Sequence, residues 1–125
     1  MPSLKDKTVL IIGRGSGIAR AMGGYQDLTA NLVNASFSVK VTGPLLLAKH
    51  LAGNVAPGGS FLFMSGATAL KPAPGMLAVA AANAAVDAVT AGLAVELAPI
   101  RVNAIAPGTI DTGASVPVDG GEHLV

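Results

Sequence analysis

A glycine-rich segment that could bind phosphate, GRGSGIA at residues 13–19, directly follows the β-branched run 8–12. Glycines allow a tight turn and close backbone approach to a phosphate, and a following helix would present free N–H groups and the positive end of its dipole. Gly13, Gly15 and Gly17 do not complete G-x-G-x-x-G, because the sixth residue is Ile18. The segment alone is compatible with a phosphate-binding loop or with a turn that binds nothing.

Few other side chains suggest chemistry. Ser65 ends an apolar run and could bind a ligand, although strand-end serines more often satisfy backbone groups. Lys40 could supply a positive charge, although a lone lysine is usually solvated. The single tyrosine, Tyr25, is expected to be a surface or packing residue. Neither His50 nor His123 has an acidic residue at a spacing that suggests a catalytic pair. The sequence shows no metal-ligand cluster and contains no cysteine.

The composition narrows the class of protein. The 125 residues are 51% hydrophobic and 12% charged, which excludes a disordered chain and favours one compact domain. A formal charge of +1 gives no electrostatic footprint for nucleic acid or an anionic membrane. The apolar run 9–12 is too short for a signal-peptide core or a membrane span, so a cytoplasmic location is expected.

Alternating apolar runs predict an α/β fold. A first helix is expected to begin at residue 18 and to end early, at Gly23 and Gly24. A second is expected over residues 28–51, with an interruption near Gly43 and Pro44. Proline- and glycine-rich loops are expected at 57–59 and 71–75, and one short strand in the tail 116–125. Further strands are predicted at residues 8–12, 61–64 and 101–105. Such alternation is typical of a parallel sheet.

A long apolar helix is predicted over residues 76–97, with Met76 and Leu97 at its ends. The mean hydropathy of the whole chain is high, at +0.61. Asn83, Asp87 and Thr90 nevertheless form one polar stripe on this helix, and Asp87 would be costly in the middle of a bilayer. We therefore expect no membrane span, but a helix buried against a sheet on one side and against another helix or subunit on the other, as in a homo-oligomer.

Five segments resemble, in order, the motifs of the short-chain dehydrogenase/reductase family. The longest is AVELAPIRVNAIAPGTIDT at residues 94–112. The loop 13–19 resembles the family's TGxxxGIG, with Ile12 in place of Thr and Ala19 in place of the last Gly. The remaining three are VTG at 41–43, the serine-bearing strand at 59–65 and VPVDGG at 116–121.

The resemblance implies an incomplete Rossmann-like, doubly wound parallel sheet that binds NAD or NADP, without deciding between them. It implies hydride transfer between the nicotinamide and an alcohol or carbonyl of a small-molecule substrate. Arg14 would be a candidate partner for a ribose 2′-phosphate, or simply a solvated arginine. The cofactor-binding residues would be Gly13, Arg14, Gly15, Ser16, Gly17, Ile18, Pro107, Gly108, Thr109, Ile110 and Thr112.

This chain departs from the family's pattern at the positions of the family's catalytic residues. The tyrosine position falls on Val79, the lysine position on Asn83 and the asparagine position on Lys40. The serine position falls on Gly66, with Ser65 just before it as the remaining catalytic candidate. The alternative reading is therefore a non-catalytic nucleotide-binding or assembly subunit, and a third is a structural scaffold that binds no nucleotide.

Residues 1–125 are expected to form a single Rossmann-type domain. The family's pattern, however, needs a longer chain than these residues provide. A βαβ unit takes roughly 30 residues or more, and the stretch between Gly17 and Val41 is too short for the strands that the family places there. Segments therefore look missing after Met22 and after Ala114. Without them the strand at 8–12 would have no neighbour to pair with.

Overall fold

The computed structural model describes residues 7–10 and 23–108. The predicted phosphate loop at 13–19, the helix beginning at residue 18 and the tail strand in 116–125 lie outside these residues. The helices and strands of the described part are α1 (Ala30–Phe37), α2 (Gly43–Leu51), β1 (Ser60–Met64), α3 (Leu77–Glu96) and β2 (Arg101–Ile105).

The predicted helix over 28–51 is one continuous helical rod rather than two interrupted pieces. Thr29 caps its start, since the Thr29 hydroxyl accepts a hydrogen bond of 3.2 Å from the backbone N–H of Leu32. A wide, π-helical turn over Ser38–Thr42 joins α1 to α2. Pro44 lies in the first turn of α2, and the interruption expected near Gly43 and Pro44 is this change of helix type over Ser38–Thr42 rather than a break in the rod.

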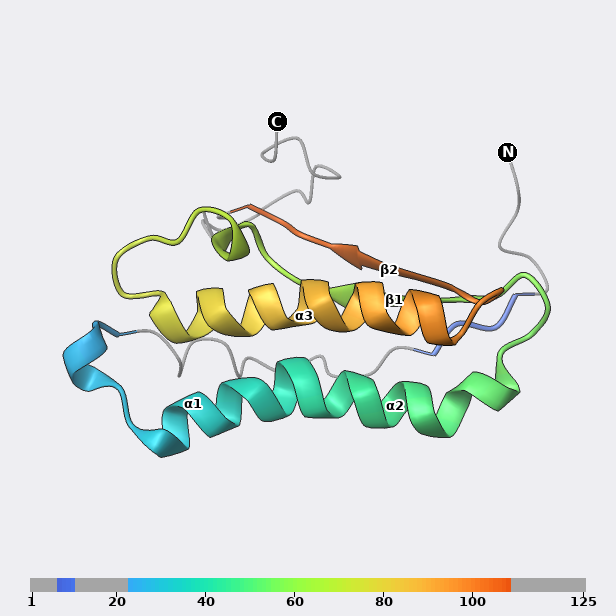
Figure 1. Ribbon diagram of the computed structural model, residues 1–125, viewed down its shortest axis with the longest axis horizontal. Helices are drawn as coiled ribbons and strands as arrows, with labels where there is room; N and C mark the ends of the chain where they lie inside the picture. Colours follow the sequence, from blue (N-terminus) through green and yellow to red (C-terminus); the bar gives the residue numbers. More distant parts are fainter. Residues whose placement is uncertain (1–6, 11–22, 109–125) are drawn as a thin grey trace.

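The sheet of the described residues consists of β1 and β2, which are parallel, as predicted, with Ser60 opposite Arg101 and Met64 opposite Ile105. Because parallel neighbours need a crossover, α3 connects them along one face. Figure 1 shows α3 lying beside the rod of α1 and α2. The buried core joins this face of the sheet to both helices, and its members are Ala48, Phe61, Phe63, Val86, Leu93 and Val102.

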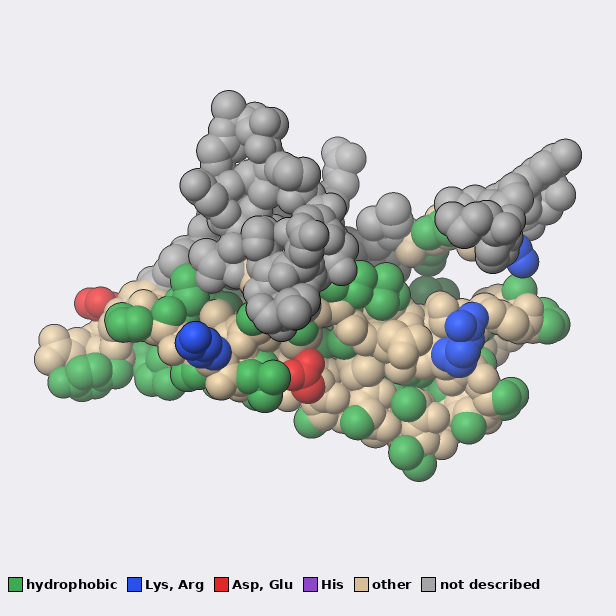
Figure 2. All heavy atoms as spheres, turned by 90° about the horizontal axis from the view of Figure 1, so that it is seen from above, with side chains coloured by type: hydrophobic (Ala, Val, Ile, Leu, Met, Phe, Trp, Pro, Cys, Tyr) green, Lys and Arg blue, Asp and Glu red, His purple; other side chains and the backbone are tan. Residues whose placement is uncertain are grey.

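The other face of the sheet is open among the described residues. Leu62, Met64 and Ile105 expose 61%, 54% and 43% of their surface. Figure 2 shows hydrophobic side chains along the molecule, with few charged ones between them. In a doubly wound fold both faces of the sheet are covered, so this open face agrees with an incomplete Rossmann-like sheet.

The strand predicted at residues 8–12 is not present over residues 8–10. These residues have no regular structure, and Val9 and Leu10 are largely exposed. An apolar, β-branched run forms a strand only when a neighbour pairs with its backbone groups.

The helix α3 has three different environments along its predicted polar stripe. Asn83 is buried, Asp87 is exposed, and the Thr90 hydroxyl donates to the Val86 carbonyl at 2.8 Å. By length and composition α3 is a candidate membrane span with a mean hydropathy of 1.6, a test that core helices of soluble proteins also pass. Its residues Val86 and Leu93 pack in the core against the sheet.

Candidate active site

The polar side chains that the sequence singled out meet where β1 and β2 end. In open α/β sheets, ligands bind outside the carboxyl ends of the strands. Ser65 follows β1 directly, and its backbone N–H donates to the Ile105 carbonyl at 2.8 Å, which extends the ladder by one residue. The Ala67 N–H donates to the Pro107 carbonyl at 3.0 Å, which places Pro107 and Gly108 beside this turn.

The Ser65 side chain is engaged by the backbone. It is 3% exposed, and its hydroxyl donates to the main-chain carbonyl of Asn83 at 3.1 Å. The hydroxyl proton therefore anchors α3 to the end of β1, and the oxygen lone pairs remain as acceptors. The structure thus supports the backbone-satisfying interpretation of Ser65, and its catalytic role stays a prediction.

Asn83 fills the space in front of Gly66. The Asn83 side-chain NH₂ donates to the Thr68 hydroxyl at 2.8 Å, and a Cβ placed on Gly66 would lie 2.5 Å from that nitrogen. Asn83 is 4% exposed, and its carboxamide oxygen is buried without a hydrogen-bond partner. An orphaned buried acceptor is costly, so this oxygen is suited to an O–H or N–H donor brought by a ligand or a water molecule.

Lys40 is buried, so the expectation that a lone lysine is solvated is wrong here. It lies in the wide turn between α1 and α2, where its ammonium donates to the Met64 carbonyl at 2.9 Å. Burial lowers the pKa of Lys40, because the charged form is poorly solvated in this position. A sequence signal was available, since Lys40 lies on the same helical stripe as Leu47, Ala48 and Leu51.

Val79, which falls on the family's tyrosine position, is buried one turn before Asn83 and packs with Ala78 and Leu28. Tyr25 does not replace it, because Tyr25 is 73% exposed and its hydroxyl accepts a local bond from Gln26. His50 is exposed in the last turn of α2. Of the predicted cofactor-binding residues, Pro107 and Gly108 are at the carboxyl edge; outside the described residues lie Gly13, Arg14, Gly15, Ser16, Gly17, Ile18, Thr109, Ile110 and Thr112.

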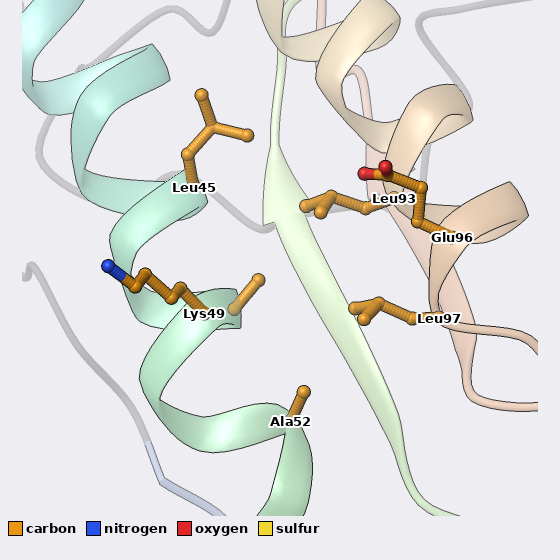
Figure 3. A pocket seen from close by; sticks show the side chains of 7 residues that line it. Leu45, Lys49, Ala52, Leu93, Glu96 and Leu97 are labelled. Carbon is orange, nitrogen blue, oxygen red and sulfur yellow. The ribbon is translucent and has the colours of Figure 1, made fainter.

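A shallow cavity of about 280 Å³ lies at the opposite end of the sheet, between α2 and the last turns of α3 (Figure 3). Its wall is mostly apolar, with Lys49 and Glu96 as its charged residues. The lining residues are Leu45, Ala48, Lys49, Ala52, Leu93, Glu96 and Leu97. The cavity is therefore separate from the polar groups at the carboxyl ends of the strands.

Comparison with known proteins assigns the chain to a family. Residues 8–125 match the family model described as enoyl-(acyl carrier protein) reductase. The short-chain dehydrogenase/reductase ucsE of Acremonium sp is 43% identical over 95 residues, which cover 74% of this chain and 35% of the relative. Human dehydrogenase/reductase SDR family member 4 is 34% identical over 97 residues, again 74% of this chain and 35% of the relative.

Solved structures agree with this match. A small-chain dehydrogenase in complex with NADPH superposes with a TM-score of 0.71 at 40% identity, over 77% of this chain and 44% of that one. An NAD⁺-bound xylitol dehydrogenase superposes with a TM-score of 0.69 at 28% identity, over 80% of this chain and 40% of that one. This chain spans less than half of each of these four proteins. It belongs to the short-chain dehydrogenase/reductase family.

Proposed function

We propose that this chain is part of an NAD(P)-dependent oxidoreductase and that it binds NAD or NADP at the carboxyl edge of the β1–β2 sheet. The observation that supports this most is the meeting of the Ser65–Gly66 turn with Pro107 and Gly108 outside the strand ends. The NADPH and NAD⁺ bound in two structural neighbours support the same cofactor class.

The side chains at this edge are better suited to binding a nucleotide than to transferring a proton. The unpartnered Asn83 carboxamide oxygen is an acceptor for a hydroxyl group such as those of a ribose. Pro107 and Gly108 would cover the nicotinamide side, and the loop containing Gly13 and Gly17 would hold the pyrophosphate. A bound nicotinamide supplies or accepts the hydride, while this chain's residues position it and exclude water.

A second candidate function is nucleotide binding without turnover. It is favoured by Val79, whose buried isopropyl group cannot donate a proton, and by the engaged hydroxyl of Ser65. Among the described residues of the site, Lys40 is the titratable side chain that lies at the end of β1. The two candidates share the binding site and differ in whether a substrate is converted.

Fluorescence titration with NADH and NADPH tests both candidates together. We expect saturable binding of at least one of the two dinucleotides, and no binding of either would refute both proposals. A panel of carbonyl and alcohol substrates then separates them, because turnover supports the oxidoreductase and binding without turnover supports the second candidate.

Arg14 offers a sharper test of cofactor choice. If its guanidinium contacts a ribose 2′-phosphate, Arg14→Ala weakens NADPH binding and leaves NADH binding unchanged. The matched control is Arg101→Ala, because Arg101 is exposed at the amino end of β2 and donates to the Gly58 carbonyl at 3.0 Å. If Arg14→Ala and Arg101→Ala bind NADPH with equal affinity, Arg14 does not contact the ribose 2′-phosphate and is a solvated arginine.

We also propose a homo-oligomer formed through α3. The exposed side of this helix carries mostly small and apolar residues, with Val95 80% exposed, and two acidic residues, Asp87 and Glu96. The small residues permit close helix packing. Analytical ultracentrifugation of the wild type and of Ala88→Lys tests this, since the variant should dissociate and a monomeric wild type would refute the proposal. The cytoplasmic location stays a prediction that cell fractionation can test.

A further inference from the structure

The carboxamide of Asn83 holds the hydroxyl of Thr68 at the carboxyl edge of the sheet. Thr68 lies in the short 3₁₀ turn Ala67–Ala69, which packs against α3. The Asn83 NH₂ group donates to the Thr68 hydroxyl oxygen at 2.8 Å. The Ala67 N–H in the same turn donates to the Pro107 carbonyl at 3.0 Å. The turn that carries Thr68 is therefore tied both to α3 and to the segment that follows β2.

This bond leaves one donor and one acceptor free. A hydroxyl oxygen that accepts from an N–H keeps its own proton to donate, and no acceptor for the Thr68 proton lies within residues 7–10 and 23–108. The Asn83 carboxamide oxygen is buried and has no hydrogen-bond partner among the same residues. The oxygen and the NH₂ group of a carboxamide share one carbon atom, so the free acceptor lies next to the free donor.

Gly66 leaves the Asn83 carboxamide the space that a side chain would take. A Cβ on Gly66 would lie 2.5 Å from the carboxamide nitrogen, 3.2 Å from Cγ and 3.6 Å from the carboxamide oxygen. Thr68 is partly buried, whereas Asn83 is 4% exposed. A ligand would therefore reach the Thr68 hydroxyl first and the Asn83 oxygen behind it.

We propose that Thr68 and Asn83 together bind a hydroxyl group of the ligand. The ligand oxygen accepts from the Thr68 O–H, and the ligand O–H donates to the Asn83 carboxamide oxygen, so one group satisfies both. The proposal rests on the proposed function, because it names the ligand group that this edge binds. That function offers two sources of a hydroxyl, a ribose of the dinucleotide and an alcohol substrate, and the pair recognises the chemistry that they share.

The pair selects a hydroxyl over a carbonyl or ether oxygen. These oxygens accept a hydrogen bond but carry no proton, so binding one would leave the buried Asn83 oxygen unpaired, which is costly. The Ser65 hydroxyl does not offer the same combination, because it donates its proton to the Asn83 main-chain carbonyl. Thr68, rather than Ser65, is thus the hydroxyl that binds the ligand.

NMR of the ¹⁵N-labelled whole chain tests the pair through the side-chain NH₂ signal of Asn83. Cyclohexanol and cyclohexanone form one matched pair of probes, and nicotinamide riboside and nicotinamide form the other. We expect cyclohexanol or nicotinamide riboside to shift the Asn83 signal saturably, and its hydroxyl-free match to bind about tenfold more weakly. The probe that does so identifies the source of the hydroxyl. If neither hydroxyl probe moves the signal, or if each binds no more tightly than its match, the proposal is overturned.

Two variants of Thr68 test the donor. Thr68→Val removes the hydroxyl at nearly constant volume, and Thr68→Ser keeps it. The Kd of the hydroxyl probe should rise about fivefold or more in Thr68→Val and stay within about twofold of the wild type in Thr68→Ser. An unchanged Kd in Thr68→Val would overturn the proposal. The comparison of matched probes uses the wild type, so it decides the question even where Thr68→Val does not fold.

The matched control is Thr90→Val. The Thr90 hydroxyl donates to the Val86 carbonyl within α3 at 2.8 Å, so its loss should leave the Kd of the probe unchanged. A rise equal to that in Thr68→Val would show that the loss of any threonine hydroxyl packed on α3 weakens binding, and would overturn the proposal.

Failure of this pair and failure of the proposed function have different signatures. If NADH or NADPH binds saturably but neither hydroxyl probe moves the Asn83 signal, the proposed function stands and the Thr68–Asn83 pair is wrong. If cyclohexanol moves the signal but neither dinucleotide binds, the pair stands and the proposed cofactor site is refuted.

Discussion

Gly66→Ala should destabilise the chain through one contact, because Gly66 and Asn83 are fitted to each other. A Cβ on residue 66 would lie 2.5 Å from the side-chain nitrogen of Asn83 and 3.2 Å from its Cγ. The backbone of Gly66 is extended, with φ of −169° and ψ of 153°, a conformation that alanine adopts freely. The cost is therefore steric and not conformational.

The magnitude follows from two opposing effects. Overpacking a buried site costs about 1–3 kcal/mol, and replacing glycine gains about 0.4–1 kcal/mol by restricting the unfolded chain. Asn83 cannot move aside cheaply, because it is buried and its NH₂ group is bonded to Thr68 at 2.8 Å. The expected net loss in the free energy of unfolding is ~1–2 kcal/mol.

Urea denaturation of four proteins measures this loss: wild type, Gly66→Ala, Asn83→Ala and the double variant. In the double variant the clash is gone, so alanine at 66 should cost nothing or be slightly favourable. The control is Gly92→Ala, since Gly92 is exposed in α3 with no atom within 4 Å of an added Cβ. This control should gain ~0.5–1 kcal/mol. A Gly66→Ala variant as stable as the wild type, beside a normal gain at Gly92, would refute the fit between residues 66 and 83.

Three further outcomes are expected. Ser65→Ala removes the hydrogen bond to the Asn83 carbonyl and should lower the free energy of unfolding by ~1 kcal/mol in the same urea assay; an unchanged value would show that the bond adds no stability. Burial in the folded chain lowers the pKa of Lys40 below 10.5, its ordinary value in the unfolded chain. Between these two pKa values the unfolded chain therefore binds more protons than the folded chain. The stability of the wild type relative to Lys40→Met should therefore rise with pH in this range and level off above 10.5, and a flat difference would contradict the burial. Thr29→Ala removes the cap bond to Leu32 and should cost ~1 kcal/mol, with loss of helix signal in circular dichroism as a second readout.

The regular elements were predictable because local sequence specifies them. The aromatic run at 61–64 and the run at 101–105 became β1 and β2, and the alanine-rich segment became α3, with bounds shifted by about one residue. The strand expected at 8–12 is wrong over its first residues, because an apolar run does not supply the neighbour that pairs with it.

The site was only partly predictable, since its contacts join residues far apart in sequence. Resemblance to the family identified positions 40, 66, 79 and 83 as a set, and the structure brings Lys40, Gly66 and Asn83 to the end of β1. The helical spacing of Lys40 to Leu47, Ala48 and Leu51 predicts its burial, but its hydrogen bond to the Met64 carbonyl joins residues 24 apart in sequence, which periodicity does not predict. The fit of Gly66 to Asn83 depends on side-chain packing between a loop and a helix.

The hydrogen bonds at the carboxyl edge favour ligand holding over proton transfer by Ser65. The Ser65 hydroxyl proton is committed to the Asn83 main chain, and one of the three Lys40 N–H groups is committed to Met64. Among the described groups of this edge, the Asn83 carboxamide oxygen is the buried acceptor without a partner. Ser65 could donate a proton to a substrate only if it gave up its hydrogen bond to the Asn83 carbonyl, whereas the Asn83 carboxamide oxygen has no hydrogen bond to give up. The hydrogen bonds at this edge therefore support the proposed dinucleotide binding more directly than they support turnover.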